Sequence, residues 1–155
     1  MERTEEIDFI ARVMLSSRKE QPPRWIADLL SWQWTWRLAR VALVSAYLIG
    51  GANKLFDFTA AVAEQEHFGL HPAWLWAVMA IVLESGGSLL VVTGRLVWLG
   101  AGSLGVLTFV AMLVANDFWS MAGQDRFMAL NAFLEHLGLI AGLVLVSIRA
   151  EEASP

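Results

Sequence analysis

The chain has 155 residues, of which 57% are hydrophobic and 17% are charged, and its mean hydropathy is +0.54. A water-soluble domain of this size has too little interior to bury so much apolar surface, so the composition disfavours a soluble globule, excludes intrinsic disorder and favours a membrane protein. The formal net charge of −4 argues against nucleic acid as a partner, and the absence of cysteine excludes disulfides, thiolate metal sites and covalent c-type haem.

The first 36 residues differ in character from the rest, because thirteen charged side chains lie within the first 40 positions. Apolar residues recur there at helical spacing, at Ile7, Ile10 and Met14. After a double proline, Arg24–Trp36 places tryptophans and a leucine on one helical stripe, and tryptophan is enriched where a bilayer meets water. We therefore expect residues 1–36 to be a cytoplasmic amphipathic segment with an interfacial helix over Arg24–Trp36. The alternative is that these tryptophans extend the first membrane span.

Four windows are long and apolar enough to cross a bilayer core, which needs about 20 residues of α-helix. The predicted spans are Leu38–Phe58, Ala73–Thr93, Leu96–Asn116 and Met128–Ile148. Short connectors force consecutive spans to run antiparallel and side by side. We therefore predict an all-α fold, an integral membrane four-helix up-down-up-down bundle over residues 37–149, with a short cytoplasmic tail at 150–155.

The distribution of Lys and Arg predicts the orientation of this bundle. Nine of these side chains lie outside the hydrocarbon on the side of both termini, and two, Lys54 and Arg126, lie on the opposite side. The positive-inside rule then places both termini in the cytoplasm.

Glycines inside the spans are predicted to be packing surfaces. Gly100–Gly105 matches the G-x-G-x-x-G pattern of nucleotide sites, but it lies in the most apolar span and follows no strand. Small residues let helix backbones approach closely in lipid, and the pairs Ala46 with Gly50 and Gly138 with Gly142 have the same spacing. The sequence leaves open whether these faces pack within one bundle or between the subunits of a homo-oligomer.

Polar side chains inside the spans each need a partner, because a charge in hydrocarbon costs at least ~2.5 kcal/mol. Glu84 lies near the middle of the second span, so we expect it to be neutral or paired within the bundle. The alternating topology brings the other polar residues to the outer leaflet above it. The predicted polar pocket consists of Lys54, Asp57, Glu84, Asn131, Glu135 and His136. Such a pocket could hold a quinone head group, relay protons or bind a small polar ligand.

A structural interpretation of the same residues stays open. Lys54 would then extend to the interface, Asp57 would cap a helix in water, and Glu84 would only bond between helices. Glu135 and His136 are adjacent and cannot share one helix face, so we expect one of them, preferentially His136, to face the bundle.

The histidines do not predict a metal or haem site. His67 and His71 have the spacing of metal ligands on a helix, but Gly69 and Pro72 interrupt it, so we expect a solvated loop. Electron-transfer haem in a membrane normally has two axial histidines on facing spans, and only His136 lies in a predicted span.

Three segments together resemble the DoxX family of membrane proteins. Gly50–Phe58 resembles the G-x-x-K-L-x-D-F signature at the end of the first span, and Leu83–Leu90 resembles the E-x-x-G-G segment of the second. Asn131–Gly142 is similar to the last span, and the resemblance covers roughly Arg37 to Arg149. It implies a four-helix integral protein of bacterial inner membranes.

The resemblance also implies an association with quinone-linked redox chemistry, through similarity to the DoxD subunit of thiosulfate:quinone oxidoreductase. A bound quinone would then have Lys54 and His136 at its carbonyls, with Glu84 or Glu135 handling protons. The chain would be a membrane subunit or anchor with a soluble or membrane redox partner. The alternative is a non-enzymatic membrane module for transport, assembly or stress protection.

Overall fold

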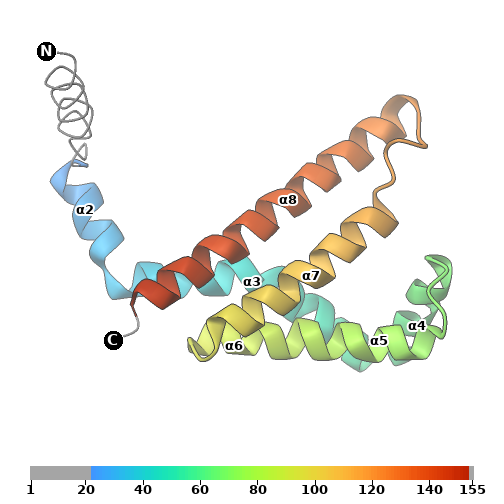
Figure 1. The fold of residues 1–155 in the computed structure, drawn as a ribbon, viewed down its shortest axis with the longest axis horizontal. Coiled ribbons are helices and arrows are strands. Elements are labelled where there is room, and N and C mark those ends of the chain that lie inside the picture. Colours follow the sequence, from blue (N-terminus) through green and yellow to red (C-terminus); the bar gives the residue numbers. More distant parts are fainter. Residues whose placement is uncertain (1–21, 154–155) are drawn as a thin grey trace, which may run out of the picture. The chain divides into compact units, whose positions relative to one another are not determined.

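The computed structural model describes residues 22–153, and every regular element in that part of the chain is a helix (Figure 1). The chain separates into two compact units, and the boundary between them follows Trp36. The predicted helical pattern at Ile7, Ile10 and Met14 lies outside the described residues, as do the last two residues of the predicted tail.

The first unit contains α2 (Arg24–Ser31), a short helix whose apolar side chains Trp25 and Leu29 are both exposed. The prediction of one helix over Arg24–Trp36 is wrong, because Trp32 has an extended backbone with ψ of 124° and ends α2. Hydroxyl side chains stabilise this break: Ser31 Oγ donates to the carbonyl of Asp28 at 3.0 Å, and Thr35 Oγ1 donates to that of Leu29 at 2.7 Å. These bonds compete with the regular helical pattern, so the predicted tryptophan stripe does not continue on one helix.

Seven helical segments follow. Their bounds are α3 (Gln33–Phe56), α4 (Phe58–His67), α5 (Ala73–Val82), the π-helical segment η1 (Leu83–Gly87), α6 (Ser88–Thr93), α7 (Val97–Ala115) and α8 (Gly123–Glu152). α5, η1 and α6 form one continuous helix, Ala73–Thr93, which is called the central helix below.

Three helices of the described chain are long and apolar enough to cross a membrane, namely the central helix, α7 and α8. The protein is therefore a multi-pass membrane protein. The second and third predicted spans coincide with the central helix and α7, and α8 extends beyond the fourth at both ends. The first predicted span corresponds to α3, whose 24 residues include Arg40 and Lys54, and α3 does not qualify by composition.

The chain between α3 and α5, expected only as a short connector between spans, contains the helix α4. Asp57 explains how α4 begins, because its Oδ1 accepts a hydrogen bond from the backbone N–H of Ala60 at 2.9 Å. Ala61 and Gln65 form the buried side of α4, which packs on α5. The short α6–α7 turn is confirmed, and Gly94 makes it with a left-handed φ of 76°.

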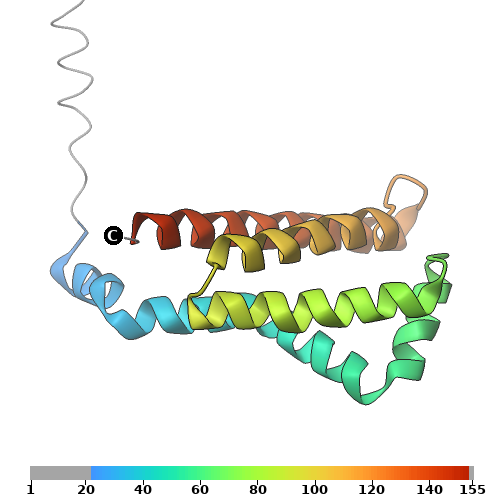
Figure 2. The same cartoon turned by 60° about the horizontal axis from the view of Figure 1, so that its bottom comes forward.

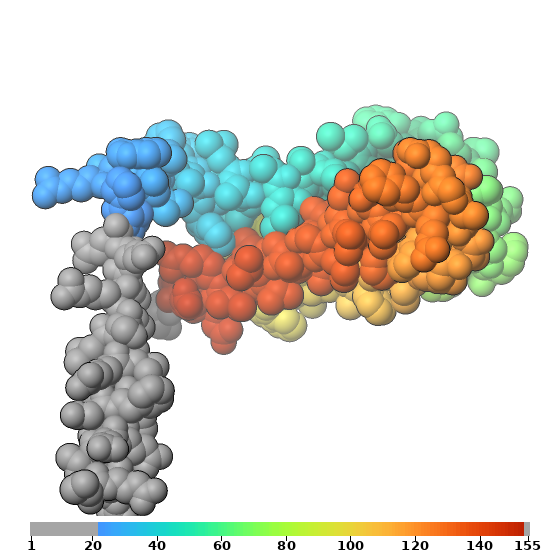
Figure 3. Space-filling view, turned by 90° about the horizontal axis from the view of Figure 1, so that it is seen from above, coloured from blue at the N-terminus to red at the C-terminus, as the bar shows by residue number. Residues whose placement is uncertain are grey.

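Within the second unit, α7 lies beside α8 (Figure 2). α3 contacts the central helix where Arg40 Nη1 donates to the carbonyl of Val91 at 3.2 Å and where Gly51 meets Ser85. A Cβ added to Gly100 would lie 2.6 Å from the carbonyl oxygen of Gly87, so α7 and η1 are in backbone contact. A Cβ on Gly142 would lie 2.9 Å from Leu43 Cδ1, where α8 meets α3 (Figure 3). The predicted packing role therefore holds at Gly100 and Gly142, whereas a Cβ on Gly138 would meet nothing within 4 Å.

Candidate functional site

An ion pair between α3 and the central helix forms the centre of the candidate site. Lys54 Nζ donates to Glu84 Oε1 at 3.2 Å and lies 3.5 Å from Oε2. The lysine side chain is 17% exposed and the glutamate side chain 12%. The expectation that Glu84 is neutral or paired within the bundle is thus met by pairing.

The π-helical turn of η1 sets the direction of Glu84. A π-helix bonds residue i to i+5, so its turns are wider than α-helical turns, and such segments occur frequently at functional sites. The turn contains Glu84 and Ser85 followed by Gly86 and Gly87. Two successive glycines in a helix are the sequence signal for an irregular turn, although they do not specify a π-helix.

Two glycines on α3 make room for this turn. A Cβ on Gly50 would lie 3.0 Å from Glu84 Oε2, and a Cβ on Gly51 would lie 2.6 Å from Ser85 Oγ. Lys54 follows Gly50 by one helical turn, and helical side chains tilt toward the N-terminus, so its ammonium reaches back to the carboxylate. Gly50, Lys54 and Glu84 are therefore parts of one contact.

Glu64 is a further charged member of the site that sequence reasoning did not select. Its Oε2 lies 3.6 Å from Lys54 Nζ, and its side chain is 47% exposed. Glu64 comes to this position because α4 packs against α5, and the sequence predicts only a connector there. An exposed glutamate in a connector has the pattern of an ordinary solvated residue.

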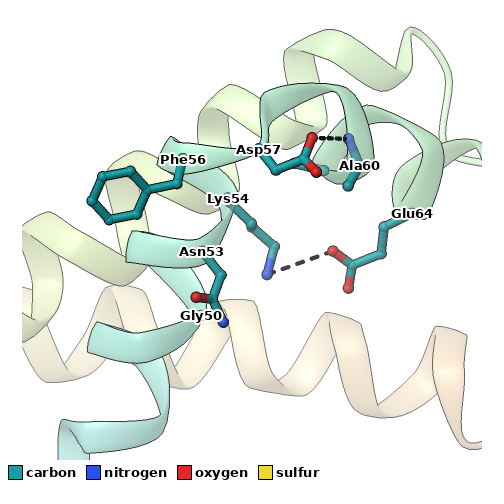
Figure 4. Close-up of a pocket in the computed structure, with 8 residues that line it drawn as sticks. Gly50, Asn53, Lys54, Phe56, Asp57, Ala60 and Glu64 are labelled. Atoms are coloured by element: carbon teal, nitrogen blue, oxygen red, sulfur yellow. Dashed lines mark hydrogen bonds and ion pairs between the residues drawn. The ribbon is translucent and has the colours of Figure 1, made fainter.

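A hollow of about 540 Å³ opens beside the ammonium of Lys54 (Figure 4). Its lining consists of Gly50, Asn53, Lys54, Phe56, Asp57, Ala60, Ala61 and Glu64. In Figure 4 the ammonium faces Glu64, while Asp57 turns to the backbone of Ala60. Glu84, which pairs with Lys54, is not in the lining. This hollow is called the lysine pocket below.

The polar residues of α8 do not join this cluster. Asn131 and Glu135 are exposed, and His136 is half-buried with its Nδ1 at 2.6 Å from the carbonyl oxygen of Ala132 on its own helix. Within residues 22–153, no hydrogen bond or ion pair links these three side chains to Lys54 or Glu84. Of the six predicted pocket residues, the structure gathers Lys54, Asp57 and Glu84.

A hydroxyl pair crosses the bundle from α3 to α7. Tyr47 Oη lies 2.5 Å from Thr108 Oγ1, and Thr108 Oγ1 donates to the carbonyl of Leu104 at 2.7 Å. Since the proton of Thr108 is used in that bond, Tyr47 is the donor in the pair. This link has no sequence signal, because a lone tyrosine and threonine in apolar spans fit ordinary packing.

His67 and His71 lie apart from any shared helix face. α4 ends at His67, and Gly69 turns the chain with a φ of 70°. In the described part of the chain, no three His, Asp or Glu side chains are grouped as metal ligands would be.

Comparison with known families gives one match. The family model described as DoxX matches residues 35–117, just over half of the chain. The matched region contains Lys54, Glu64 and Glu84, and it ends before α8. No curated protein and no solved structure matches the chain.

Proposed function

Since the chain belongs to the DoxX family, we propose that it is a membrane subunit or anchor of a quinone-linked oxidoreductase system of the bacterial inner membrane. The observation that carries the proposal is a largely buried ammonium, Lys54, at the wall of a hollow whose mostly apolar lining includes Asn53 and Glu64. Ligand sites are typically concave, with a few placed polar groups that orient the ligand. An ammonium on a pocket wall is suited to donate to a carbonyl oxygen of a quinone head group.

The proposed topology has four crossings, with α3 as the first. α3 has 24 residues and is about 36 Å long at 1.5 Å per residue, which is enough to span the bilayer core. Its contacts through Gly50 and Leu43 with the other helices support a place inside the bundle. The excess of Lys and Arg on the side of the termini supports a cytoplasmic location for both ends. Residues 1–36 are then the cytoplasmic amphipathic segment.

Each pocket residue has a proposed role. Lys54 supplies the donor, and Glu84 holds and neutralises it, because an isolated charge at that depth would be costly. Asp57 fixes the start of α4, the helix that forms one wall of the pocket. Asn131, Glu135 and His136 remain predicted polar partners on α8.

The proposal is tested by filling the pocket without touching the ion pair. Ala60 is exposed and lines the pocket, whereas Ala63 is exposed on the same helix and does not. The protein would be purified in mild detergent, and its copurified lipids would be extracted and identified by mass spectrometry. We expect quinone to copurify with the native protein and with Ala63→Trp, and to be lost from Ala60→Trp. Equal quinone content in the two variants would contradict the proposal.

A non-enzymatic membrane module is the second candidate, and one observation favours it. The ammonium of Lys54 already lies between two carboxylates, so the cluster could serve only to hold α3, α4 and the central helix together. In that case, Ala60→Trp would complement a deletion strain as well as the native gene does. The quinone proposal predicts that Ala60→Trp fails while Ala63→Trp succeeds.

A further inference from the structure

The charges around the lysine pocket are unbalanced. Its lining has one cation, Lys54, and two carboxylates, Asp57 and Glu64. Glu84, outside the lining, already accepts from Lys54, and Glu64 lies 3.6 Å from the same nitrogen. The ammonium donates to the two oxygens of Glu84, which leaves its third proton, together with the exposed oxygens of Glu64, open to a ligand. Among the charged groups of the lining, acceptors exceed donors, and the amide of Asn53 can both donate and accept.

This imbalance discriminates between the two redox forms of a quinone. A quinone carbonyl is an acceptor only, so beside Glu64 it would bring two partial negative charges together. A hydroquinone hydroxyl can donate to the carboxylate of Glu64 and accept from the ammonium of Lys54 at the same time. Hydrogen bonds to an ionised acceptor are roughly twice as strong as neutral ones.

We propose that the lysine pocket binds the reduced, dihydroxy form of a quinone in preference to the oxidised form, with Glu64 as the acceptor of the ligand hydroxyl. This inference rests on the proposed function, since it assumes that the pocket holds a quinone head group. It assigns Glu64 as a ligand-binding residue and states which redox form of the ligand binds more tightly.

A preference between redox forms shifts the potential of the bound couple. Tenfold tighter binding of the hydroquinone raises the midpoint potential of the two-electron couple by about 30 mV. The pocket would then stabilise the reduced ligand relative to the same ligand free in the bilayer.

The test uses the full-length protein in lipid nanodiscs under anaerobic conditions. The probe is a benzoquinone with a short isoprenoid tail, titrated in its oxidised and in its reduced form by calorimetry. We expect the reduced form to bind the native protein about tenfold more tightly, since the one added hydrogen bond, from the hydroxyl to the carboxylate of Glu64, needs to contribute only ~1.4 kcal/mol for that factor. Glu64→Gln should reduce the preference to twofold or less, because the amide also offers an N–H donor to a carbonyl.

Glu66 provides a matched control, because it is exposed on the same helix and does not line the pocket. Glu66→Gln should keep the native preference, and Glu64→Ala should lose it without adding a donor. Far-UV circular dichroism and a monodisperse elution profile establish that each variant is folded.

The outcomes separate the two proposals. Equal affinity for both forms, or tighter binding of the quinone, would overturn the preference for the reduced form and leave quinone binding intact. A preference that survives in Glu64→Gln and Glu64→Ala would overturn the role of Glu64. Absence of binding of either form to the native protein would overturn the proposed function and this inference with it.

Discussion

The central helix meets α3 and α7 through the same π-helical turn but in two chemically different ways. Toward α3, the glycines Gly50 and Gly51 belong to the partner helix, and the space they leave holds the side chains of Glu84 and Ser85. Toward α7, a glycine stands on each helix, and Gly87 and Gly100 bring the two backbones together. One contact contains an ion pair, and the other brings two backbones together.

This comparison shows that glycine in a membrane helix has two uses. Where only one helix has glycine, the gap accommodates a polar side chain of the neighbour, and a pocket can develop beside it. Where both helices have glycine, the gap closes and the contact serves packing alone. The family match includes both contacts, since residues 35–117 contain Gly50, Glu84 and Gly100.

Breaking the charged contact should have the largest effect. Lys54→Met leaves Glu84 without its cation, and removal of one partner of a buried pair costs about 3–5 kcal/mol. We expect a correspondingly lower free energy of unfolding in detergent, measured by denaturant titration followed through tryptophan fluorescence. The double variant Lys54→Met/Glu84→Leu should recover most of the loss. A double variant as unstable as Lys54→Met would show that the pair does not govern this contact.

Adding a single methyl group at the backbone contact between α7 and η1 should lower the stability of the protein. Gly100→Ala places a Cβ 2.6 Å from the carbonyl oxygen of Gly87, and overpacking of this kind costs about 1–3 kcal/mol. Gly102 is the control on the same helix, because its Cβ would meet nothing within 4 Å. Thermal unfolding should occur at a lower temperature for Gly100→Ala and at an unchanged or higher temperature for Gly102→Ala. Equal midpoints would refute the close approach of α7 and η1.

Asp57 tests whether charge or capping matters at the edge of the lysine pocket. Asp57→Ala removes the acceptor for the Ala60 N–H and should cost about 1 kcal/mol. Asp57→Asn keeps a side-chain oxygen and should unfold at nearly the native denaturant concentration. If Asp57→Asn is as unstable as Asp57→Ala, the charge rather than the cap is important.

The smallest effect is expected at the link between α3 and α7. Tyr47→Phe removes the hydroxyl that donates to Thr108, and such bonds between membrane helices average about 0.6 kcal/mol. Thr108 keeps its own bond to the carbonyl of Leu104. Thr108→Val in the Tyr47→Phe background should then show coupling in a double-mutant cycle of unfolding free energies. Additive effects would mean that the two hydroxyls do not interact.

The sequence predicts the helices best where a long apolar run determines them. The central helix and α7 coincide with predicted spans because each is a continuous apolar stretch, and Gly94 marks the turn between them. α4 could not be predicted, because its buried residues Ala61 and Gln65 become a packing face only when α5 is beside them. The interruption at Trp32 depends on hydroxyl bonds that an apolar stripe does not reveal.

The candidate site was predictable in its centre and less so at its edges. Glu84 stands out in sequence because a carboxylate in hydrocarbon needs a partner, and Lys54 is the cation that the topology brings to it. Glu64 was missed because its role depends on the fold of α4. The polar residues of α8 were grouped with the site only because the predicted topology brings them to the same depth in the bilayer. Depth in the bilayer does not specify the direction in which a side chain points.

The π-helical turn also affects how the central helix tolerates changes in length. Because η1 holds more residues per turn than an α-helix, α6 is rotated about the helix axis relative to α5. A turn of this kind takes up one extra residue, so loss of one residue there would restore a regular helix in which α5 and α6 keep their present faces, with little shortening of the crossing. The stretch Leu83–Gly87 is therefore a place where the central helix can lose one residue without changing which helices its two halves contact.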